Sequence, residues 1–292
     1  MTGASGFVGA HFCRLAAARG FKVRGLWRNT ALNLPGVEAV HGDIRSVADP
    51  RCDVVVHLAA KVMADDALEQ NRAMLDHVLA WKRPVVYASS TVVHWPTDVG
   101  YARSRREDEA RIRGSGLPFL IVRPCAPYGP KLVGHQPAHK ESFHTLVDWV
   151  RRLPAIPVVG NARYRRQPVH VDDFNGAILA LIGQDRGAQP SSAGGTAGGW
   201  SRAYDSGGPD ALTMREVITV LGGHAGRLWT PLLRVPTSAA WLAAHALPNM
   251  RPELIRTFAM DDAVDPLPLQ GASGVVPRTF EVGSLDLFGP TS

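Results

Sequence analysis

Three glycines near the start of the sequence have the spacing of a phosphate-binding turn. Gly3, Gly6 and Gly9 are three residues apart, and an apolar, alanine-rich stretch over 10–19 is predicted to be helical. In such a turn one glycine allows the tight bend, one lacks the Cβ that would strike a pyrophosphate, and one lets helix and sheet touch. The anion would lie on backbone N–H groups at the positive end of the helix dipole. Nucleotide binding is the leading hypothesis, with a Gly-rich surface turn as the alternative.

A second set of reactive side chains follows an apolar, β-branched run. Ser89, Ser90 and Thr91 end this run, and hydroxyls at the carboxyl end of a buried strand can touch a substrate outside the sheet. The same residues can also form an ordinary turn. Tyr101 and Arg105 lie four residues apart in a polar segment predicted to be helical, so they share one helical face. The spacing alone does not separate a reactive pair from two surface neighbours.

Two charged residues lie where the adenosine half of a dinucleotide would be recognised. Arg28 ends a predicted strand over 21–27, at about the distance from Gly9 where an acidic residue would bind the ribose of NAD. An arginine there accommodates the 2′-phosphate of NADP instead, so Arg28 favours NADP over NAD, with a solvated turn arginine as the alternative. Asp43 follows the next predicted strand and could bind the adenine amino group or cap a helix.

The elements that would position these residues alternate between strands and helices. Apolar runs over 37–44, 53–60, 84–91 and 119–122 are typical of strands buried on both faces, and a helical pattern covers 68–81. This order predicts an α/β protein with a Rossmann-type, doubly wound parallel sheet. Ligands of such sheets bind outside the carboxyl ends of the strands.

The predicted sheet lacks most of its first strand. Only Met1 and Thr2 precede Gly3, whereas this fold places a central strand before the glycine turn. Without that strand its neighbours would lose their hydrogen-bond partners. The first strand is therefore expected to be truncated, for example by a misplaced initiation codon, or to be replaced by an unusual substitute.

Composition and charge are those of an ordinary soluble protein, which we expect in the cytoplasm. The chain has 292 residues, 45% of them hydrophobic and 20% charged, enough for one large or two intimate domains. The longest apolar run, 239–247, is too short for a membrane span. The net charge of +6 suits a phosphate-bearing cofactor or substrate, and no basic and aromatic motif points to nucleic acid.

Cysteine and histidine spacing argues against a metal site. Cys13, Cys52 and Cys125 are far apart and are expected to be reduced thiols in a reducing compartment. The histidines are scattered without metalloenzyme spacing.

Taken together, the motifs resemble the extended short-chain dehydrogenases/reductases, the NAD-dependent epimerase/dehydratase group. The resemblance covers about residues 1–225 and depends on the order of seven segments. They are Thr2-Gly3-x-x-Gly6-x-x-Gly9, Gly42-Asp43, His57-Leu58-Ala59-Ala60, Ser89-Ser90, the Tyr101 helix, Arg123-Pro124 with Tyr128-Gly129-Pro130, and His170-Val171-Asp172-Asp173. The group includes nucleotide-sugar epimerases, dehydratases, ketoreductases and 3β-hydroxysteroid dehydrogenases.

The resemblance implies a role for each matching residue. The catalytic residues would be Ser90 or a neighbouring hydroxyl, Tyr101, and Arg105 at the position of a lysine. NADP, or else NAD, would be bound by Gly3, Ser5, Gly6, Phe7, Val8, Gly9, Arg28, Asp43, Ile44, Leu58, Ala59, Ala60, Ser89, Tyr101, Arg105 and Pro124. A small-molecule substrate would contact Ser90, Thr91, Tyr128 and Arg166. Family members often dimerise through the tyrosine helix, so a homodimer is also expected.

The chemistry of Tyr101 would be proton transfer at a secondary alcohol or ketone. A phenol has a reference pKa of about 10, and lowering it by roughly three units requires about 4 kcal/mol of preferential phenolate stabilisation. A cation one helical turn away and the positive nicotinamide could supply this. The hydroxyl of Ser90 would orient the carbonyl oxygen while hydride passes to or from the nicotinamide.

Arg105 departs from the family pattern, in which a lysine is expected. Arginine keeps its charge, but its larger planar fork need not reach the ribose hydroxyls as an ammonium does. The interval between Ser90 and Tyr101 is also shorter than in nucleotide-sugar epimerases, which would reshape the pocket.

The second half of the chain is expected to form most of a small substrate-binding cap. Residues 1–130 and 167–204 would make the dinucleotide-binding domain, and residues 131–166 and 205–292 the cap. In nucleotide-sugar enzymes the arginine matching Arg166 contacts a substrate phosphate. The alternative is that Arg166 pairs with Asp172 or Asp173.

Three functions fit these observations. The first is an NADP-preferring oxidoreductase or epimerase acting on a secondary alcohol or ketone, with a nucleotide sugar as a candidate substrate. The second is a hydroxysteroid or other lipophilic-ketone dehydrogenase, which the apolar residues Trp229, Leu232 and Trp241 would suit. The third is a non-catalytic NADP-binding sensor or assembly factor, suggested by Arg105 and the short first strand.

Overall fold

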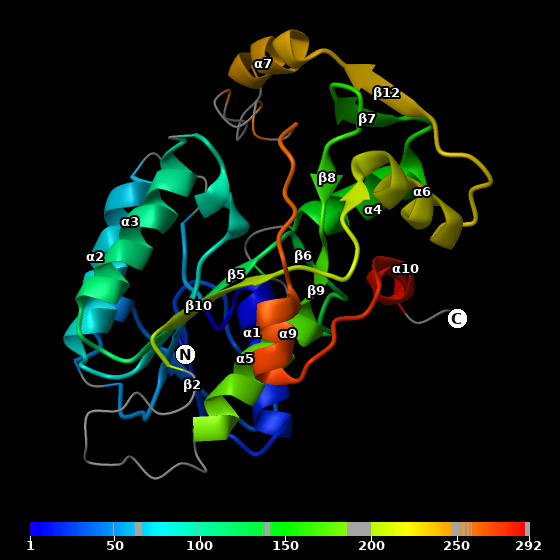
Figure 1. Ribbon diagram of the computed structural model, residues 1–292. Helices are drawn as coiled ribbons and strands as arrows, with labels where there is room; N and C mark the ends of the chain where they lie inside the picture. Colours follow the sequence, from blue (N-terminus) through cyan, green and yellow to red (C-terminus); the bar gives the residue numbers. More distant parts are fainter. Residues whose placement is uncertain are drawn as a thin grey trace.

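Parallel strands form the centre of the molecule, which is described here from a computed structural model (Figure 1). The structure describes residues 1–48, 50–61, 66–97, 99–135, 137, 141–185, 200–246, 252, 255, 257 and 259–289. Four parallel strands pair in the order β10, β5, β4, β3, and β1 pairs with β2 in a separate parallel pair. Their bounds are β1 Val23–Trp27, β2 Val37–His41, β3 Val55–His57, β4 Val85–Ala88, β5 Phe119–Pro124 and β10 Arg202–Ser206. This parallel arrangement confirms the predicted α/β fold.

Helices cover both faces of the sheet, as a doubly wound fold requires. One face packs against α1, α5 and α9, and the other against α2 and α3. Successive residues of β4 face opposite sides, since Val86 lies in the core under α1 and α5 while Val85 and Tyr87 lie in the core under α2 and α3. The helix bounds are α1 Phe7–Ala18, α2 Ala67–Ala80, α3 Gly100–Gly114, α5 Val171–Asp185 and α9 Leu267–Ser273.

The strands are shorter than the apolar runs predicted them to be, because short 3₁₀ turns begin where they end. The run over 37–44 forms β2, and η1 (Ile44–Ser46) then begins with Asp43 as its cap. The run over 84–91 forms β4, and η2 (Thr91–His94) begins after Ser90. In both cases a side chain that accepts a backbone N–H ends the strand.

Met1 and Thr2 lie at the place of the expected first strand, between β1 and β3. The N–H of Thr2 donates to the carbonyl of Val56 at 2.9 Å, and the N–H of Leu58 donates to that of Thr2 at 3.2 Å. On the other side the N–H of Leu26 donates to the carbonyl of Met1 at 2.9 Å. Two residues thus continue the parallel pattern between β1 and β3, but β1 and β3 do not join into one sheet.

A second hydrophobic core lies beside the first, under short strands and helices of the later sequence. Its elements include two strand pairs, β12 with β7 and β11 with β8, together with α4 and α6. Thr213 and Glu216 form the capping box that starts α6. The bounds are α4 Ser142–Arg152, β7 Ile156–Val159, β8 Arg165–Arg166, β11 Leu212–Thr213, α6 Met214–His224 and β12 Leu232–Val235.

The remaining short elements connect the two cores or extend from them. Helix α7 (Thr237–Ala246) stands at the edge of the molecule near β12 (Figure 1). No helix among the described residues is both long and apolar enough to cross a bilayer. The other bounds are β6 Pro127–Tyr128, β9 Val169–His170, α10 Phe280–Gly283 and η3 Ser284–Phe288.

Candidate functional site

The glycine turn at the start of α1 has a geometry that only glycine permits at two positions. Gly3 has a φ of 71°, and a Cβ on it would lie 2.6 Å from the backbone N of Ala59. A Cβ on Gly9 would lie 2.0 Å from the carbonyl oxygen of Gly3. Neither contact is possible for a real side chain, so the turn holds α1 directly against the segment after β3.

The first turn of α1 presents backbone N–H groups to the space in front of it. The first helical hydrogen bond runs from the N–H of Ala10 to the carbonyl of Gly6, so the N–H groups of Phe7, Val8 and Gly9 precede it. Gly6 caps the helix without a side chain. The turn therefore fits the pyrophosphate of a dinucleotide by its own geometry.

His135 contacts the glycine turn from 130 residues further along the chain, and no spacing in the sequence indicates this contact. Its Nε2 is 3.0 Å from the carbonyl oxygen of Ser5, and the side chain is buried. Phe7, two residues after Ser5, is buried on α1, and its ring packs edge-on against His11 and His144 at about 5 Å. His135 therefore contacts the turn, while Gly6 at its centre remains exposed.

Five of the other predicted cofactor residues, Leu58, Ala59, Ala60, Ser89 and Pro124, lie at the carboxyl ends of β3, β4 and β5. Leu58 and Ala59 contact the glycine turn, whereas Ala60 is exposed. The carbonyl of Pro124 accepts a hydrogen bond from the hydroxyl of Thr91 at 3.4 Å. Because these strands are parallel, their ends meet at one edge of the sheet, the edge that also carries the turn.

The hydroxyl cluster after β4 also has local structural roles. Ser90 accepts a hydrogen bond from the N–H of Val92 at 3.4 Å and so caps η2. Ser89 is buried, and its N–H donates to the carbonyl of Val122. Of the three hydroxyl residues, Ser90 is the one that remains partly exposed, while Ser89 and Thr91 are buried.

The predicted adenosine-binding residues form a charged cluster at the end of β1. Arg28 donates to the carboxylate of Asp43 at 2.8 Å, and Arg45 donates to the same carboxylate at 2.8 Å and 3.0 Å. The hydrogen bonds from Arg45, and then Arg28, hold the pKa of Asp43 well below its usual range. Ile44, by contrast, is buried in the core under α2. The cluster holds two arginines for one aspartate.

Tyr101 and Arg105 share one face of α3, as their spacing predicted. The guanidinium carbon of Arg105 lies 5.3 Å from the centre of the Tyr101 ring. Tyr101 is half-buried at the first turn of the helix. Helix α3 packs on η2, the turn that Ser90 caps, so the three predicted catalytic residues belong to one local assembly.

Arg105 is enclosed by side chains from α3 and β4. Its guanidinium also lies 5.3 Å from the ring of Tyr87 on β4 and pairs with Asp108 at 3.3 Å. The hydroxyl of Tyr87 donates to Asp108 at 2.7 Å. Only 2% of the Arg105 side chain and 4% of the Asp108 side chain are exposed. The charge expected to act on Tyr101 is therefore shared with a buried carboxylate.

Burial and charge shift the pKa of several groups around Arg105. Burial raises the pKa of Asp108, although Arg105 opposes the shift. Burial also raises the pKa of Tyr87 well above its ordinary value. Burial and the nearby Arg105 lower the pKa of His57 to about 3, so this imidazole is neutral at physiological pH.

His57 links the glycine turn to the α3 residues. Its Nδ1 lies 2.6 Å from the hydroxyl of Thr2, next to Gly3, and its ring stacks on Tyr87 at 5.8 Å. Tyr87 in turn packs on Arg105 and Arg105 on Tyr101. Buried contacts therefore run without a break from the start of the glycine turn to the half-buried phenol.

Two predicted substrate residues lie away from this assembly. Tyr128 is buried in the second core between Phe143 and Phe280, and burial raises its pKa. Arg166 on β8 lies over the ring of Tyr164 and donates to the backbone carbonyl of Met260. The structure places neither beside the Tyr101 face of α3.

The two aspartates offered as alternative partners of Arg166 bind other cations. Asp172 pairs with His11 at 3.0 Å and with Arg14 at 2.8 Å, and Asp173 pairs with Arg278 at 2.8 Å. Burial of Asp172 opposes the effect of its cations, yet their hydrogen bonds lower its pKa to about 2. These pairs tie α5 to α1 and to the segment after α9.

Sequence spacing could have indicated Asp108 but not the other missed residues. Tyr101, Arg105 and Asp108 are separated by four and three residues, so they lie on one helical face. Tyr87 and His135 reach the site only through the packing of distant segments. Among the described residues there is no group of three or more histidines, cysteines or carboxylates that could hold a metal ion.

Comparison with known proteins identifies the family. A model of the NAD dependent epimerase/dehydratase family matches residues 1–93 and 94–193, well over half of the chain. The chain belongs to this family, whose members are enzymes of the extended short-chain dehydrogenase/reductase type. The resemblance drawn from the motifs is thereby confirmed.

Individual relatives are more distant. A ceramide reductase of Caulobacter vibrioides is 28% identical over an alignment of 205 positions that covers 62% of this chain and 59% of the relative. A dTDP-4-dehydro-6-deoxy-D-allose reductase of Streptomyces bikiniensis is 27% identical over 233 residues, covering 62% of this chain and 71% of the relative. The chain thus spans about three fifths of the length of the ceramide reductase.

Solved structures show the same fold. A UDP-glucose 4-epimerase of Thermotoga maritima, solved with UDP-glucose, superimposes with a TM-score of 0.72 at 16% identity. The match covers 98% of this chain and 96% of that one. At this identity the likeness concerns the fold, and the chemistry has to be argued from the side chains.

Proposed function

We propose that this enzyme is an NAD(P)-dependent oxidoreductase or epimerase that acts on a secondary alcohol or ketone, with Tyr101 as general acid and base. The observation that carries the proposal is the line of buried contacts from Thr2 through His57, Tyr87 and Arg105 to Tyr101. These contacts connect the glycine turn, where a dinucleotide would bind, to the Tyr101 phenol and its neighbouring cation, Arg105.

Each residue of the α3 assembly would contribute to the proton transfer. The phenol of Tyr101 would give its proton to the substrate oxygen as a ketone becomes an alcohol, and would take it back in the reverse direction. Arg105 would stabilise the phenolate, to the extent that Asp108 leaves its charge available. Ser90, the partly exposed hydroxyl, would donate a hydrogen bond to the substrate oxygen.

The cofactor would be held mainly by backbone. The N–H groups of Phe7, Val8 and Gly9 would bind its pyrophosphate, and the Ala59 segment would border its nicotinamide half. A bound nicotinamide cofactor supplies or accepts the hydride of such reactions. Its other predicted contacts are Gly3, Ser5, Gly6, Arg28, Asp43, Ile44, Leu58, Ala60, Ser89, Tyr101, Arg105 and Pro124.

NADP is the cofactor that the charged cluster at the end of β1 favours. Arg28 and Arg45 together carry one more charge than Asp43 neutralises, and a 2′-phosphate would bind this excess. We expect Arg28→Ala to raise the KM for NADPH about tenfold and to leave the KM for NADH nearly unchanged. An equal change in KM for NADPH and NADH would show that Arg28 does not bind the 2′-phosphate.

Turnover of a ketone panel tests the catalytic role of Tyr101. Wild type, Tyr101→Phe and Tyr204→Phe would be compared by NADPH consumption. Loss of the acid should lower kcat by about 10²- to 10⁴-fold in Tyr101→Phe. Tyr204 lies on β10 and packs in the core under α1 and α5, so Tyr204→Phe should keep the wild-type kcat. Unchanged kcat in Tyr101→Phe would disprove the assignment.

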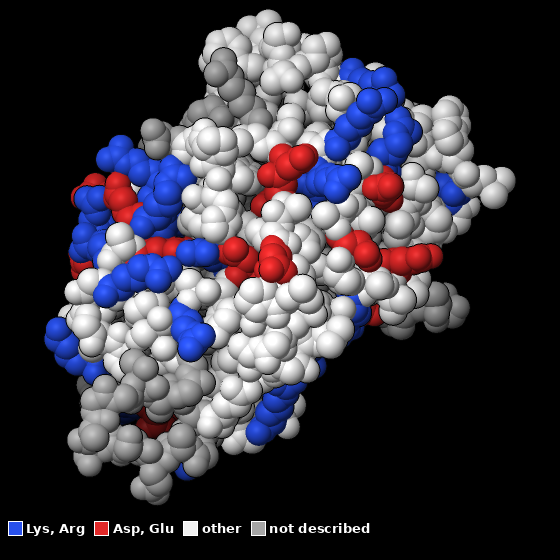
Figure 2. All heavy atoms as spheres, in the orientation of Figure 1, with Lys and Arg blue, Asp and Glu red and all other residues white. Residues whose placement is uncertain are grey.

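A nucleotide sugar is the substrate class best supported by charge. The dTDP-sugar reductase and the UDP-glucose epimerase act on such compounds by name, and basic side chains gather over the β7 and β12 region of the cap (Figure 2). Arg166 and Tyr164 lie in this part of the molecule, where cations would bind a diphosphate.

A lipophilic ketone is the second candidate. Trp241 and Leu242 on α7 are 45% and 68% exposed, and Trp229 is 76% exposed, an apolar surface on the same cap. One of the relatives is named a ceramide reductase, and ceramide is a lipid. The ketone panel should therefore contain both a nucleotide 4-ketosugar and a long-chain ketone, and the higher kcat/KM decides between them.

The remaining expectations complete the proposal. Residues 1–130 and 167–204 would form the cofactor domain, and residues 131–166 and 205–292 the substrate cap. The enzyme would act in the cytoplasm on small molecules, as a homodimer through α3.

A further inference from the structure

Residues 91–97, called here the connecting segment, lead from the hydroxyl cluster toward Tyr101. The segment begins with η2, directly after Ser90, and α3 begins at Gly100, one residue before Tyr101. Ser90 and Tyr101 can act on the same substrate oxygen only if their separation is fixed. A side chain that fixes the connecting segment therefore also fixes these two groups.

Arg106 binds the connecting segment from the second turn of α3. Its Nη1 donates to the carbonyl oxygen of Val93 at 3.3 Å and to that of Trp95 at 3.2 Å, and its Nη2 donates to the carbonyl oxygen of Thr97. One half-buried guanidinium thus binds three carbonyls at alternate positions. The planar fork of arginine suits this arrangement, whereas the donors of a lysine surround a single nitrogen.

The same three residues also form hydrogen bonds within the segment, through their N–H groups. The N–H of Val93 donates to the carbonyl of Ser90 at 3.2 Å. The N–H of Trp95 donates to the carbonyl of Val92 at 3.1 Å, and the N–H of Thr97 donates to that of Trp95 at 2.8 Å. Exchange of these three amide hydrogens with solvent therefore reports how often the connecting segment opens.

The first turn of α3, which carries Tyr101, has no side-chain cap. Val99 is the N-cap residue, and its side chain makes no capping hydrogen bond. An uncapped first turn leaves backbone N–H groups without intrahelical partners and tends to fray. Arg106 lies beyond this turn and binds the residues before it, so its hydrogen bonds span the weak part of the helix.

His94 ties the connecting segment to α3 by a second route. Its Nε2 lies 2.9 Å from the carboxylate of Asp205 on β10, which pairs with Arg123 of β5 at 3.1 Å. Arg123 in turn pairs with Glu109 of α3 at 2.6 Å. The side chain of His94 is 46% exposed, and exposed ion pairs contribute little. We therefore assign the main role to Arg106.

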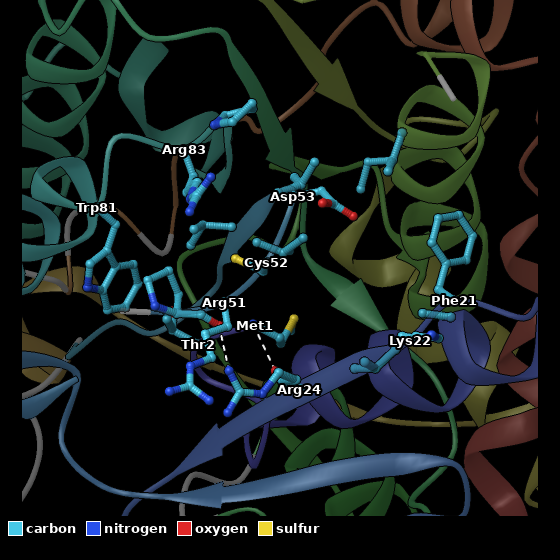
Figure 3. Close-up of a pocket in the computed structure, with 18 of the residues that line it drawn as sticks. Met1, Thr2, Phe21, Lys22, Arg24, Arg51, Cys52, Asp53, Trp81 and Arg83 are labelled. Carbon is cyan, nitrogen blue, oxygen red and sulfur yellow. Dashed lines mark hydrogen bonds between the residues drawn. The ribbon is translucent and has the colours of Figure 1, made fainter. Parts of the chain in front are cut away.

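The substrate is expected at the edge of the sheet that carries the connecting segment. A cavity of about 1710 Å³ around Met1 lies at the other edge (Figure 3). Its lining includes the first residues of β1, β3 and β5, which are Val23, Val55 and Phe119. Neither Ser90 nor Tyr101 lines this cavity, and ligands of doubly wound sheets bind outside the carboxyl ends of the strands.

We propose that Arg106 is a positioning residue, which sets the separation of Ser90 and Tyr101 by fixing the connecting segment. This inference rests on the proposed function, in which both groups act on one substrate oxygen. Arg106 binds backbone carbonyls of the segment and not the cofactor. Its loss should therefore lower kcat and leave NADPH binding unchanged.

Amide hydrogen exchange of the protein without substrate tests whether Arg106 fixes the segment. In Arg106→Met the amides of Val93, Trp95 and Thr97 should exchange at least about tenfold faster than in wild type. Arg111→Met is the matched control on the same helix, because Arg111 pairs with Asp76 of α2, and it should leave these amides unchanged. Wild-type exchange rates in Arg106→Met would overturn the proposal, whatever the activity of the enzyme.

Kinetics on the ketone panel test the positioning role. Arg106→Met should lower kcat about 10- to 100-fold, while the Kd for NADPH, measured by calorimetry, should stay within about twofold of wild type. Arg111→Met should keep the wild-type kcat. Wild-type kcat in Arg106→Met, or a loss of the same size in Arg111→Met, would overturn the proposal.

Arg106→Lys provides a milder variant that retains the positive charge. It should recover part of kcat and part of the amide protection, because an ammonium cannot bind all three carbonyls from one plane. Full recovery of both would show that charge alone suffices and would overturn the role of the guanidinium fork. If wild type turns over no ketone, the proposed function fails by itself, and the exchange experiment still tests whether Arg106 fixes the segment.

Discussion

The glycine turn and the α3 assembly reach their geometry in different ways. The turn is made of backbone, and its shape follows from the absence of a Cβ at Gly3 and Gly9. The α3 assembly is made of side chains, and Arg105 keeps its place because Asp108, Tyr87 and Tyr101 surround it. The turn therefore depends on steric fit of the backbone, whereas the α3 assembly depends on the pairing of a buried cation with a buried carboxylate.

The largest effect should come from removing the buried cation. Arg105→Met leaves Asp108 buried without its partner, and we expect the free energy of unfolding to fall by about 3–5 kcal/mol. Urea unfolding measures this loss. The double variant Arg105→Met with Asp108→Asn should regain part of it, because no uncompensated charge remains.

Arg103→Met is the matched control on the same helix. Arg103 pairs with Glu107, but its side chain is 60% exposed, so its removal should cost less than about 1 kcal/mol. If Arg105→Met and Arg103→Met lowered the free energy of unfolding by the same amount, burial of the Arg105–Asp108 pair would contribute nothing beyond an exposed ion pair, and the prediction would be wrong.

A somewhat smaller effect is expected from crowding the glycine turn. Gly9→Ala places a Cβ 2.0 Å from the carbonyl of Gly3, and relief of this contact should cost about 3 kcal/mol. The shift of α1 should also weaken NADPH binding, measured by calorimetry. Gly183→Ala in α5, where a Cβ meets nothing within 4 Å, should be neutral or slightly stabilising. Full NADPH affinity in Gly9→Ala would refute the steric account.

The smallest of the three effects is a pH dependence of the free energy of unfolding that comes from His57, the residue between the glycine turn and the α3 assembly. His57 stays neutral in the folded protein down to a pKa of about 3, compared with 6.5 for an ordinary histidine. Below pH 6.5 the imidazole of His57 binds a proton in the unfolded chain but not in the folded protein. The free energy of unfolding therefore falls as the pH falls below 6.5. Between pH 6.5 and 4.5 this loss amounts to about 2 kcal/mol.

Variants assign this loss to one residue. Urea unfolding at several pH values should give a flatter profile for His57→Asn than for wild type. The exposed residue His245 provides the control, since His245→Asn should keep the wild-type slope. A His57→Asn profile as steep as wild type would mean that another group takes up the proton.

Features that depend on local backbone were predicted well from the sequence. The glycine spacing and the helical face shared by Tyr101 and Arg105 depend on residues within a few positions of one another. The alternation of apolar runs and helical patterns predicted the parallel sheet, and the order of the motifs indicated the family. Strand ends were less well predicted, because Asp43 and Ser90 cap turns inside the apolar runs.

The sequence by itself determined the glycine turn, the alternation of strands and helices, and the helical face that a phenol shares with a cation, since these follow from chain geometry over short distances. Only the tertiary structure decided how much charge that cation has to share. It brought Tyr87 on β4 against Arg105 and His57 on β3 against Tyr87, and it placed Tyr128 in a core. Burial by distant segments sets the local dielectric and the hydrogen-bond partners, and no spacing within the sequence encodes them.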